Sequence, residues 1–183
     1  AHYHGQTVNY QKMASHMDLS VPTLKKYLNI LVRTYMLRLL PPAAASLKKR
    51  VIKSPKVYLR DSGILHTLLD IEDYDRLLAH PIAGYSWEAF VMENIISRNK
   101  LWRPSFIRTS NGAEIDLIME CGNRRHLFEM KLSKAPKPSR GFHELTKILS
   151  LDSARIIAPV DEPFEILPGV IVCPPDDRGT VCK

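Results

Sequence analysis

Cysteine, glycine and long apolar runs are all scarce in this sequence of 183 residues. The three cysteines, Cys121, Cys173 and Cys182, form neither a CxxC pair nor a Cys/His ligand spacing, so we expect no disulfide framework and no structural zinc site. The longest apolar runs, such as Ile115–Met119, are far shorter than the roughly 18 residues that cross a membrane. No charged leader followed by an apolar stretch is visible either. We therefore expect a cytoplasmic protein without a membrane partner.

Two catalytic signatures are also missing. No GxxxxGK[ST] phosphate loop occurs, so we expect no nucleotide site in this chain. No Gly-x-Ser-x-Gly elbow occurs, which disfavours acyl-transfer chemistry. The chain begins Ala-His-Tyr without an initiator methionine, and both processing and an origin as the C-terminal fragment of a longer protein explain this start.

The composition is that of a globular protein, with 45% hydrophobic and 25% charged residues and no repeated segment. The formal net charge of +7 is unevenly placed, because residues 1–80 carry 12 Lys/Arg and 6 Asp/Glu, whereas residues 81–183 carry 14 and 13. A basic first half suggests a polyanionic partner, although a basic surface with no partner has the same composition.

The first half predicts a helix-turn-helix. Val8–Met17 is predicted as a short helix and Val21–Met36 as a longer one, which Ser20 caps. Four apolar residues of the longer helix recur at helical spacing and are expected in the core: Leu24, Leu28, Leu31 and Tyr35. The second helix of such a pair can lie in the major groove of DNA, and the same arrangement also serves in protein docking.

A basic hairpin is predicted to follow these helices, with strands at Leu37–Leu40 and Val57–Leu59. Together the elements predict a winged helix-turn-helix, whose cations can bind the phosphate backbone by releasing condensed counterions. Seven cations are predicted to contact duplex DNA: Lys25, Lys26, Arg33, Lys48, Lys49, Arg50 and Lys53. Lys56 is expected as a further flexible cation of the hairpin.

A boundary is expected near residue 80, where an acidic connector at 72–75 follows a helix capped at Asp61. This gives expected domains at 1–80 and 81–183. The second is predicted to contain a helix, three strands, a helix and two later strands, at Ser86–Arg98, Phe106–Thr109, Glu114–Glu120, His126–Leu132, Gly141–Leu151, Arg155–Ala158 and Val170–Cys173. Gly112 and Gly122 lie in the expected turns, which favour an antiparallel meander within a mixed α/β (α+β) fold.

Acids and a lysine in two neighbouring strands suggest metal-dependent hydrolysis. Glu114 and Asp116 alternate with apolar residues, and Glu129 alternates likewise with Lys131, so each pair is expected on one sheet face. Carboxylates of Asp116 and Glu129 suit Mg²⁺ or Mn²⁺, and Lys131 could orient or deprotonate an attacking water or stabilise developing negative charge. A solvent-facing sheet with cross-strand ion pairs has the same pattern.

These residues resemble the PD-(D/E)xK restriction-endonuclease-like superfamily, with Glu88 on the first helix, Asp116 on the second strand and Glu129–Lys131 on the third. Nearly the whole chain is also similar to the C-terminal part of a prokaryotic family of predicted AAA-type ATPases, in which a winged helix and an uncharacterised nuclease-like domain follow a Walker-motif ATPase domain. The matching stretches are Ser54–Gly63, Gly84 with Trp87–Val91, Arg108–Thr109 with Gly112–Asp116, and Phe128–Lys131.

The resemblance implies an α-β-β-β-α-β core and a role for each matching residue. It makes Asp116 and Glu129 metal ligands, the Met130 carbonyl a further ligand, Lys131 the catalytic lysine and Glu88 an auxiliary acid. It also implies an upstream ATPase domain as a partner if the chain is a fragment, and the missing phosphate loop supports that origin.

The expected function is that of a DNA-associated module, in which a Mg²⁺-dependent endodeoxyribonuclease is joined to a winged helix that binds duplex DNA. The alternative is a catalytically inactive C-terminal region that binds DNA or docks a protein within a larger AAA-type ATPase, because this scaffold also hosts inactive members. The two differ in metal binding by Asp116 and Glu129. A transcription regulator would use the helix-turn-helix alone and leaves the acids unexplained.

Overall fold

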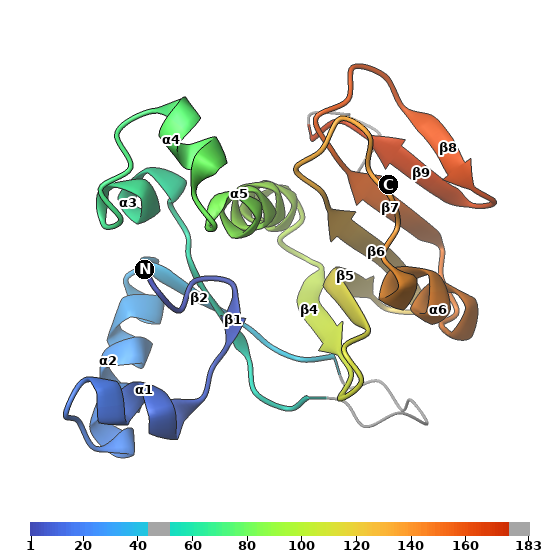
Figure 1. The fold of residues 1–183 in the computed structure, drawn as a ribbon. Coiled ribbons are helices and arrows are strands. Elements are labelled where there is room, and N and C mark those ends of the chain that lie inside the picture. The colour runs from blue at the N-terminus through green and yellow to red at the C-terminus, as the bar shows by residue number, and fades with distance from the viewer. Residues whose placement is uncertain (44–51, 176–183) are drawn as a thin grey trace. The chain divides into compact units, whose positions relative to one another are not determined.

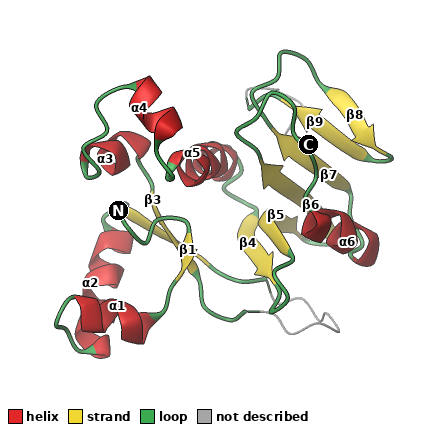
Figure 2. Ribbon diagram, in the orientation of Figure 1, coloured by secondary structure: helices red, strands yellow, loops and turns green. Residues whose placement is uncertain are grey.

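The computed structural model describes residues 1–43 and 52–175, and the chain divides into two compact units. Unit 1 consists of Ala1–Pro41 and Lys53–Phe90, and unit 2 of Pro42–Ile52 and Val91–Lys183. Helices and strands are mixed along the described chain, and the strands form two separate sheets, which confirms the expected mixed α/β fold (Figures 1 and 2). Within the described ranges, every helix is too short or too polar to cross a membrane.

Unit 1 combines short helices with a small antiparallel sheet of order β1-β3-β2. Its elements are β1 (Gln6–Thr7), α1 (Tyr10–His16), α2 (Val21–Arg33), β2 (Leu37–Leu40), β3 (Lys56–Leu59), α3 (Ser62–Thr67) and α4 (Tyr74–Ala79). The predicted helix pair is confirmed, and Ser20 Oγ caps α2 by accepting a hydrogen bond from the Thr23 amide at 3.2 Å.

The core of unit 1 lies between the helix pair and the sheet, where Leu24 and Leu28 of α2 pack with Val57 of β3. The expectation that Leu31 and Tyr35 also lie in the core is wrong, because 39% of Leu31 and 75% of Tyr35 are exposed. Helix α2 ends at Arg33, and Tyr35 adopts a left-handed φ of 61° that turns the chain away from the helix.

Unit 2 is built on a six-stranded sheet of order β4-β5-β6-β7-β9-β8 (Figure 1). The strands are β4 (Arg103–Arg108), β5 (Glu114–Cys121), β6 (Arg124–Met130), β7 (Ser153–Ile157), β8 (Phe164–Leu167) and β9 (Val170–Cys173). The predicted antiparallel meander of β4, β5 and β6 is confirmed. Beyond it, β7 runs parallel to β6 and to β9, and β8 closes the far edge.

Two helices complete this part of the chain. Helix α5 (Ala83–Arg98) begins in unit 1 and ends in unit 2. Helix α6 (Arg140–Ile148) buries Phe142 and Leu145 against one face of the large sheet, in a core that includes Ile118 and Leu127. Gly141 allows this close packing, since a Cβ there would lie 2.6 Å from the Glu114 backbone nitrogen.

Three elements have no counterpart among the predictions, namely β1, α4 and β8. The acidic segment at 72–75 was expected to be a connector. Instead Asp73 caps α4 by accepting a hydrogen bond from the Arg76 amide, so the acids begin a helix, as acids at helix N-termini commonly do.

Candidate functional site

The centre of the predicted site contains a β-bulge. Ser105 pairs with Ile118 and Ile107 pairs with Ile115, so two steps along β4 face three steps along β5. Strand β5 therefore carries one extra residue at Asp116–Leu117. Ile115 and Ile118 consequently lie in one core cluster, and the strict alternation expected from Glu114 to Met119 is wrong at this point. Bulges often aim a side chain at an active site.

The carboxylate of Asp116 lies where the pairing of β5 with β6 stops. Backbone pairs run from Cys121 with Arg124 as far as Leu117 with Phe128. At the next position, Asp116 Oδ2 accepts a hydrogen bond from the Met130 backbone amide at 2.9 Å. The Lys131 amide bonds in the opposite direction, to Ile157 of β7. Since neighbouring residues of a strand alternate sides, the Met130 carbonyl points toward β5, as its amide does.

Glu129 is buried on β6 beside a partly open lysine. Its Oε1 lies 2.8 Å from Lys131 Nζ, and the lysine side chain is 34% exposed while that of Glu129 is 3% exposed. This ion pair confirms the prediction that the two residues share a face. Both oxygens of Glu129 also accept the Ser139 backbone amide, at 3.3 and 3.2 Å, and Ser139 is the N-cap of α6.

The donor atoms at this end of β6 are of the types that a hard divalent cation prefers. Asp116 and Glu129 supply carboxylate oxygens and Met130 a carbonyl oxygen, a set that Mg²⁺ accepts when water and phosphate complete its coordination. In the part of the chain that the structure describes, no three side chains of His, Cys, Asp or Glu gather closely enough to hold a metal by themselves. A cation here would therefore depend on the backbone carbonyl and on oxygens from outside the protein.

Glu88, the fourth predicted site residue, lies in unit 1 and has different partners. Its Oε1 accepts hydrogen bonds from Lys56 Nζ, at 3.1 Å, and from the Tyr58 hydroxyl. The side chains of Lys56 and Glu88 are 2% and 11% exposed, so the pair is sealed from water. We call Lys56, Tyr58 and Glu88 the sealed cluster. The expectation that Lys56 is a flexible hairpin cation is wrong, because its side chain is buried against Glu88. Sequence reasoning missed Tyr58, although its position two residues along β3 places it on the same strand face as Lys56.

The predicted DNA-binding cations are only partly accounted for. Lys25, Lys26 and Arg33 are exposed on α2, and Lys53 is exposed before β3. The hairpin cations Lys48, Lys49 and Arg50 lie outside the described residues. The same helix also presents large apolar side chains to water, since 51% of Tyr27 and 49% of Ile30 are exposed. The outer face of α2 is therefore basic and apolar together.

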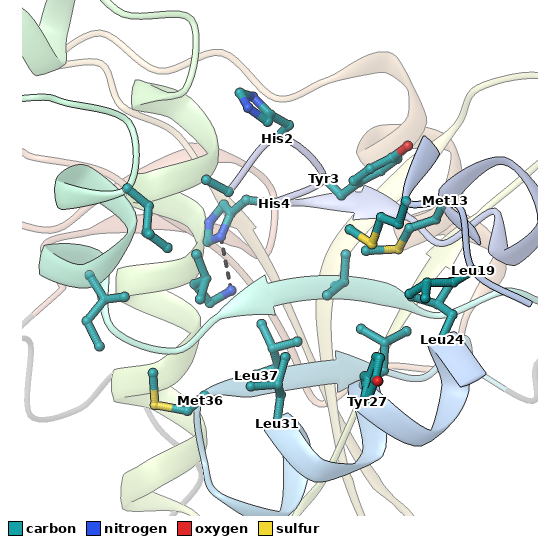
Figure 3. Close-up of a pocket in the computed structure, with 17 residues that line it drawn as sticks. His2, Tyr3, His4, Met13, Leu19, Leu24, Tyr27, Leu31, Met36 and Leu37 are labelled. Atoms are coloured by element: carbon teal, nitrogen blue, oxygen red, sulfur yellow. Dashed lines mark hydrogen bonds between the residues drawn. The ribbon is translucent and has the colours of Figure 1, made fainter. Parts of the chain in front are cut away.

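An apolar pocket opens beside this helix in unit 1 (Figure 3). Its volume is about 410 Å³, and the 17 residues that line it come from Ala1–His4, from the helices α1 to α3, from the small sheet and from the turns next to these elements. Several large side chains at the pocket remain exposed, among them Met17, Leu31, Met36 and Leu68. The exposure of Leu31, which contradicts the sequence prediction, follows from this pocket.

His4 lies at the wall of the pocket and is fixed in a neutral form (Figure 3). Its Nδ1 accepts a hydrogen bond from the Leu59 amide at 3.1 Å, and its Nε2 donates to the Tyr85 carbonyl at 3.2 Å. Burial lowers the pKa of His4 to about 4. The ring also packs edge-on against Tyr58 of the sealed cluster, with 5.5 Å between ring centroids.

Two families of unknown function match the chain. Residues 83–175, more than half of it, match the family described as Domain of unknown function (DUF4143). The chain belongs to the DUF4143 family. Residues 1–75 match a second family, Domain of unknown function (DUF8612). Asp116, Glu129 and Lys131 fall within the DUF4143 match, whereas the apolar pocket falls within the DUF8612 match.

Two curated mycobacterial proteins are similar to this DUF4143 chain. They are the uncharacterized proteins Mb2031c of Mycobacterium bovis and Rv2008c of Mycobacterium tuberculosis, each 36% identical over 179 residues. The match covers 96% of this chain, but the chain spans only 40% of the length of each relative. No solved structure matches the chain.

Proposed function

We propose that unit 2 is a Mg²⁺-dependent nuclease of the PD-(D/E)xK type, an endodeoxyribonuclease that hydrolyses phosphodiester bonds. The observation that carries this proposal is the arrangement at the end of β6, where a bulge in β5 brings the Asp116 carboxylate to the Met130 backbone, next to the buried Glu129 and its partner Lys131. Asp116, Glu129 and the Met130 carbonyl are the proposed ligands of Mg²⁺ or Mn²⁺.

A bound divalent cation supplies Lewis-acid polarisation of the scissile phosphate. In the proposed reaction, the oxygen of a water molecule bonds to phosphorus while one phosphorus–oxygen ester bond breaks. The water loses a proton to solvent, and the leaving oxygen gains one.

Lys131 has the chemistry for a positioning and charge-stabilising role in this reaction. It is the cation of an ion pair with Glu129, so it donates hydrogen bonds and accepts none. With a third of its side chain exposed, its ammonium group can meet both an attacking water and an anionic phosphate oxygen. Because Glu88 is buried in the sealed cluster, we propose that this acid stabilises the fold of unit 1.

Incubation of supercoiled, linear and branched DNA with the purified chain tests the proposal, with Mg²⁺, with Mn²⁺ and with a chelator. Cleavage that requires metal and disappears in Asp116→Asn supports it. Asparagine keeps an oxygen that can accept the Met130 amide, so this change removes the charge without removing that hydrogen bond. Equal cleavage by wild type and Asp116→Asn would overturn the assignment of this site.

Unit 1 is proposed to act as a winged helix that binds the backbone of duplex DNA through Lys25, Lys26, Arg33, Lys48, Lys49, Arg50 and Lys53. Each phosphate contact that is lost should make the dependence of log affinity on log salt shallower by roughly 0.9. Resemblance to the C-terminal part of AAA-type ATPases supports an upstream ATPase domain as the partner in a longer protein.

A second function, protein docking by unit 1, is favoured by the apolar pocket. Exposed apolar side chains of this size are unusual on a surface that binds only DNA, and they mark protein contacts more often. The mycobacterial relatives extend well beyond the part that matches this chain. The proposed occupant of the pocket is the apolar face of a helix from the corresponding additional part of a protein of that length.

For a protein as long as the mycobacterial relatives, the docking proposal predicts that the part outside this match, expressed separately, binds this chain. Leu31→Lys should abolish that binding, because it places a charge at the pocket. Ile171→Lys, a change at an equally exposed residue of β9, is the control and should leave binding intact. No binding by wild type, or equal binding by Leu31→Lys, would exclude this occupant.

A further inference from the structure

The segment that runs from the end of β6 to the first residue of α6 carries a regular series of cations. Lys131, Lys134, Lys137 and Arg140 recur at every third residue, and no acid occurs between Glu129 and Glu144. Lys134, Lys137 and Arg140 are exposed. We call residues 131–140 the basic loop. Its four cations contrast with the nearly balanced charge of the second half of the chain.

Both ends of the basic loop are attached to the candidate site. The Lys131 amide donates to the Ile157 carbonyl at 2.9 Å, and the Lys131 ammonium pairs with Glu129. At the other end, the Ser139 amide donates to the same carboxylate, and Ser139 Oγ accepts the Phe142 amide at 3.1 Å. Glu129 therefore holds the start and the end of the loop.

The middle of the loop is stiffened by its sequence. Pro136 and Pro138 flank Lys137, and a residue before proline is restricted to extended backbone. Pro136 is buried, and the Ala135 amide donates to Ser133 Oγ at 3.2 Å. A stiff loop loses less conformational entropy when it binds a ligand than a flexible loop of the same length does.

Two of the cations have no acidic partner among the residues that the structure describes. Lys134 and Lys137 form no ion pair with any residue of the described ranges 1–43 and 52–175. Arg140 does pair with Glu144, at 3.0 Å, but its side chain is 94% exposed and remains open to another anion. The loop thus presents net positive charge to solvent beside a site proposed to bind phosphate.

We propose that the basic loop binds the phosphate backbone of nucleic acid next to the scissile bond, with Lys134 and Lys137 as its main contacts. The phosphates of a nucleic-acid strand form a linear series of negative charges. The exposed cations of the stiff loop form a linear series of positive charges that is complementary to it. The statement that this contact lies next to the scissile bond rests on the proposed nuclease function, whereas the statement that the loop binds the phosphate backbone does not.

The test measures the binding of fluorescently labelled duplex and single-stranded oligonucleotides over a range of salt, in chelator so that no cleavage occurs. Lys134→Gln/Lys137→Gln should make the slope of log affinity against log salt shallower by about 1.8 for duplex or about 1.4 for a single strand, from two lost phosphate contacts. The control, Lys100→Gln/Lys147→Gln, removes two exposed lysines elsewhere in unit 2 and should leave the slope unchanged.

Lys134→Arg/Lys137→Arg keeps both charges and should restore the wild-type slope, which separates charge from any effect of the substitutions on folding. The proposal is overturned if wild type binds neither oligonucleotide at low salt, or if the glutamine variant and the control have the same slope. It is also overturned if the glutamine variant loses binding to vesicles of anionic phospholipid but keeps its DNA slope.

Cleavage assays separate this proposal from the nuclease assignment. If wild type cleaves with Mg²⁺ but the glutamine variant binds DNA as wild type does, the loop proposal fails and the nuclease assignment stands. If wild type does not cleave but the variant has the shallower slope, the nuclease assignment fails and the loop still binds nucleic acid.

Discussion

Each unit of the protein contains a buried glutamate paired with a lysine, and the two pairs differ in their access to water. In unit 1, Glu88 is held by Lys56, whose side chain is 2% exposed, and by the Tyr58 hydroxyl. In unit 2, Glu129 is held by Lys131, whose side chain is 34% exposed, and by the Ser139 amide. The first pair is closed on all sides, whereas the second has a lysine that solvent and ligands can reach.

We interpret this difference as one between a structural role for Glu88 and the proposed chemical role of Lys131. A sealed ion pair has given up its hydration, so its members depend on each other, and losing one leaves the other buried with a charge to satisfy. A cation that remains partly hydrated can leave its carboxylate partner for another anion at a lower cost in free energy. Changes in the sealed cluster should therefore alter stability, and changes in the open pair should alter activity.

The largest effect is expected at the open pair. Lys131→Ala should lower the rate of DNA cleavage by about 10³-fold, equivalent to about 4 kcal/mol of transition-state stabilisation, since a positioned charged group is lost. The free energy of unfolding should fall by about 1–3 kcal/mol, less than at the sealed cluster, because the buried Glu129 loses its cation but keeps the Ser139 amide as a donor. Single-turnover cleavage and urea denaturation measure the two quantities. A large loss of stability with cleavage retained would reverse the comparison.

The opposite outcome is expected at the sealed cluster. Glu88→Ala should lower the free energy of unfolding by about 4 kcal/mol, because Lys56 loses its buried carboxylate partner. The matched control is Glu72→Ala, which breaks the exposed pair with Arg76 and should cost less than about 1 kcal/mol. Urea denaturation of both variants checks the prediction, and equal losses of stability would show that the cluster is not sealed.

Acid should weaken unit 1 through His4, which packs against Tyr58 of the sealed cluster. Burial lowers its pKa from 6.5 to about 4, so between these values the unfolded chain binds a proton that the folded chain does not. Stability should therefore fall by up to about 3 kcal/mol as pH drops through this window. Burial also lowers the pKa of His66, which adds to the effect in unit 1, and that of His126, which acts in the same direction in unit 2.

His4→Gln should flatten this dependence, because it removes the group with the most strongly lowered pKa, while His2→Gln, at an exposed position, should leave it unchanged. Denaturation midpoints at neutral pH and near pH 5 are the measurement. Identical pH profiles for wild type and His4→Gln would contradict the assignment of the effect to His4.

The smallest effect concerns the packing behind the open pair. Gly141→Ala should lower the free energy of unfolding by about 1–3 kcal/mol, because its Cβ would lie 2.6 Å from the Glu114 backbone nitrogen. Gly84→Ala in α5 is the control, since nothing lies within 4 Å of its Cβ position, and it should be neutral or stabilise by up to about 1 kcal/mol. Thermal unfolding compares them, and an equal response at both positions would contradict the close packing of α6 on β5.

Local sequence signals predicted the regular elements well. Ser20 and the apolar spacing of Leu24 and Leu28 located α2, and β2 and β9 lie where the sequence predicted them. Alternation along β6 correctly placed Glu129 and Lys131 on one face. These features depend on residues close together in the chain, whose periodicity is visible in the sequence.

Features that depend on pairing between distant segments could not be predicted in this way. The bulge at Asp116 exists only in the register between β4 and β5, and β1 has just two residues, too few for any periodicity. The Glu88 partners come from a strand about 30 residues earlier in the chain. Leu31 has the spacing of a core residue, but the chain contains nothing in the described part that covers it fully.

Calorimetric titration with Mn²⁺ and Mg²⁺ decides whether the end of β6 binds a divalent cation as proposed. Wild type should bind either metal, with or without DNA. Asp116→Asn should lose at least about tenfold in affinity, because an anionic oxygen ligand is replaced by a neutral one, and Lys131→Ala should retain binding, because an ammonium group is not a ligand. No heat of binding to wild type, or equal binding by Asp116→Asn, would show that Asp116 and Glu129 do not form a metal site.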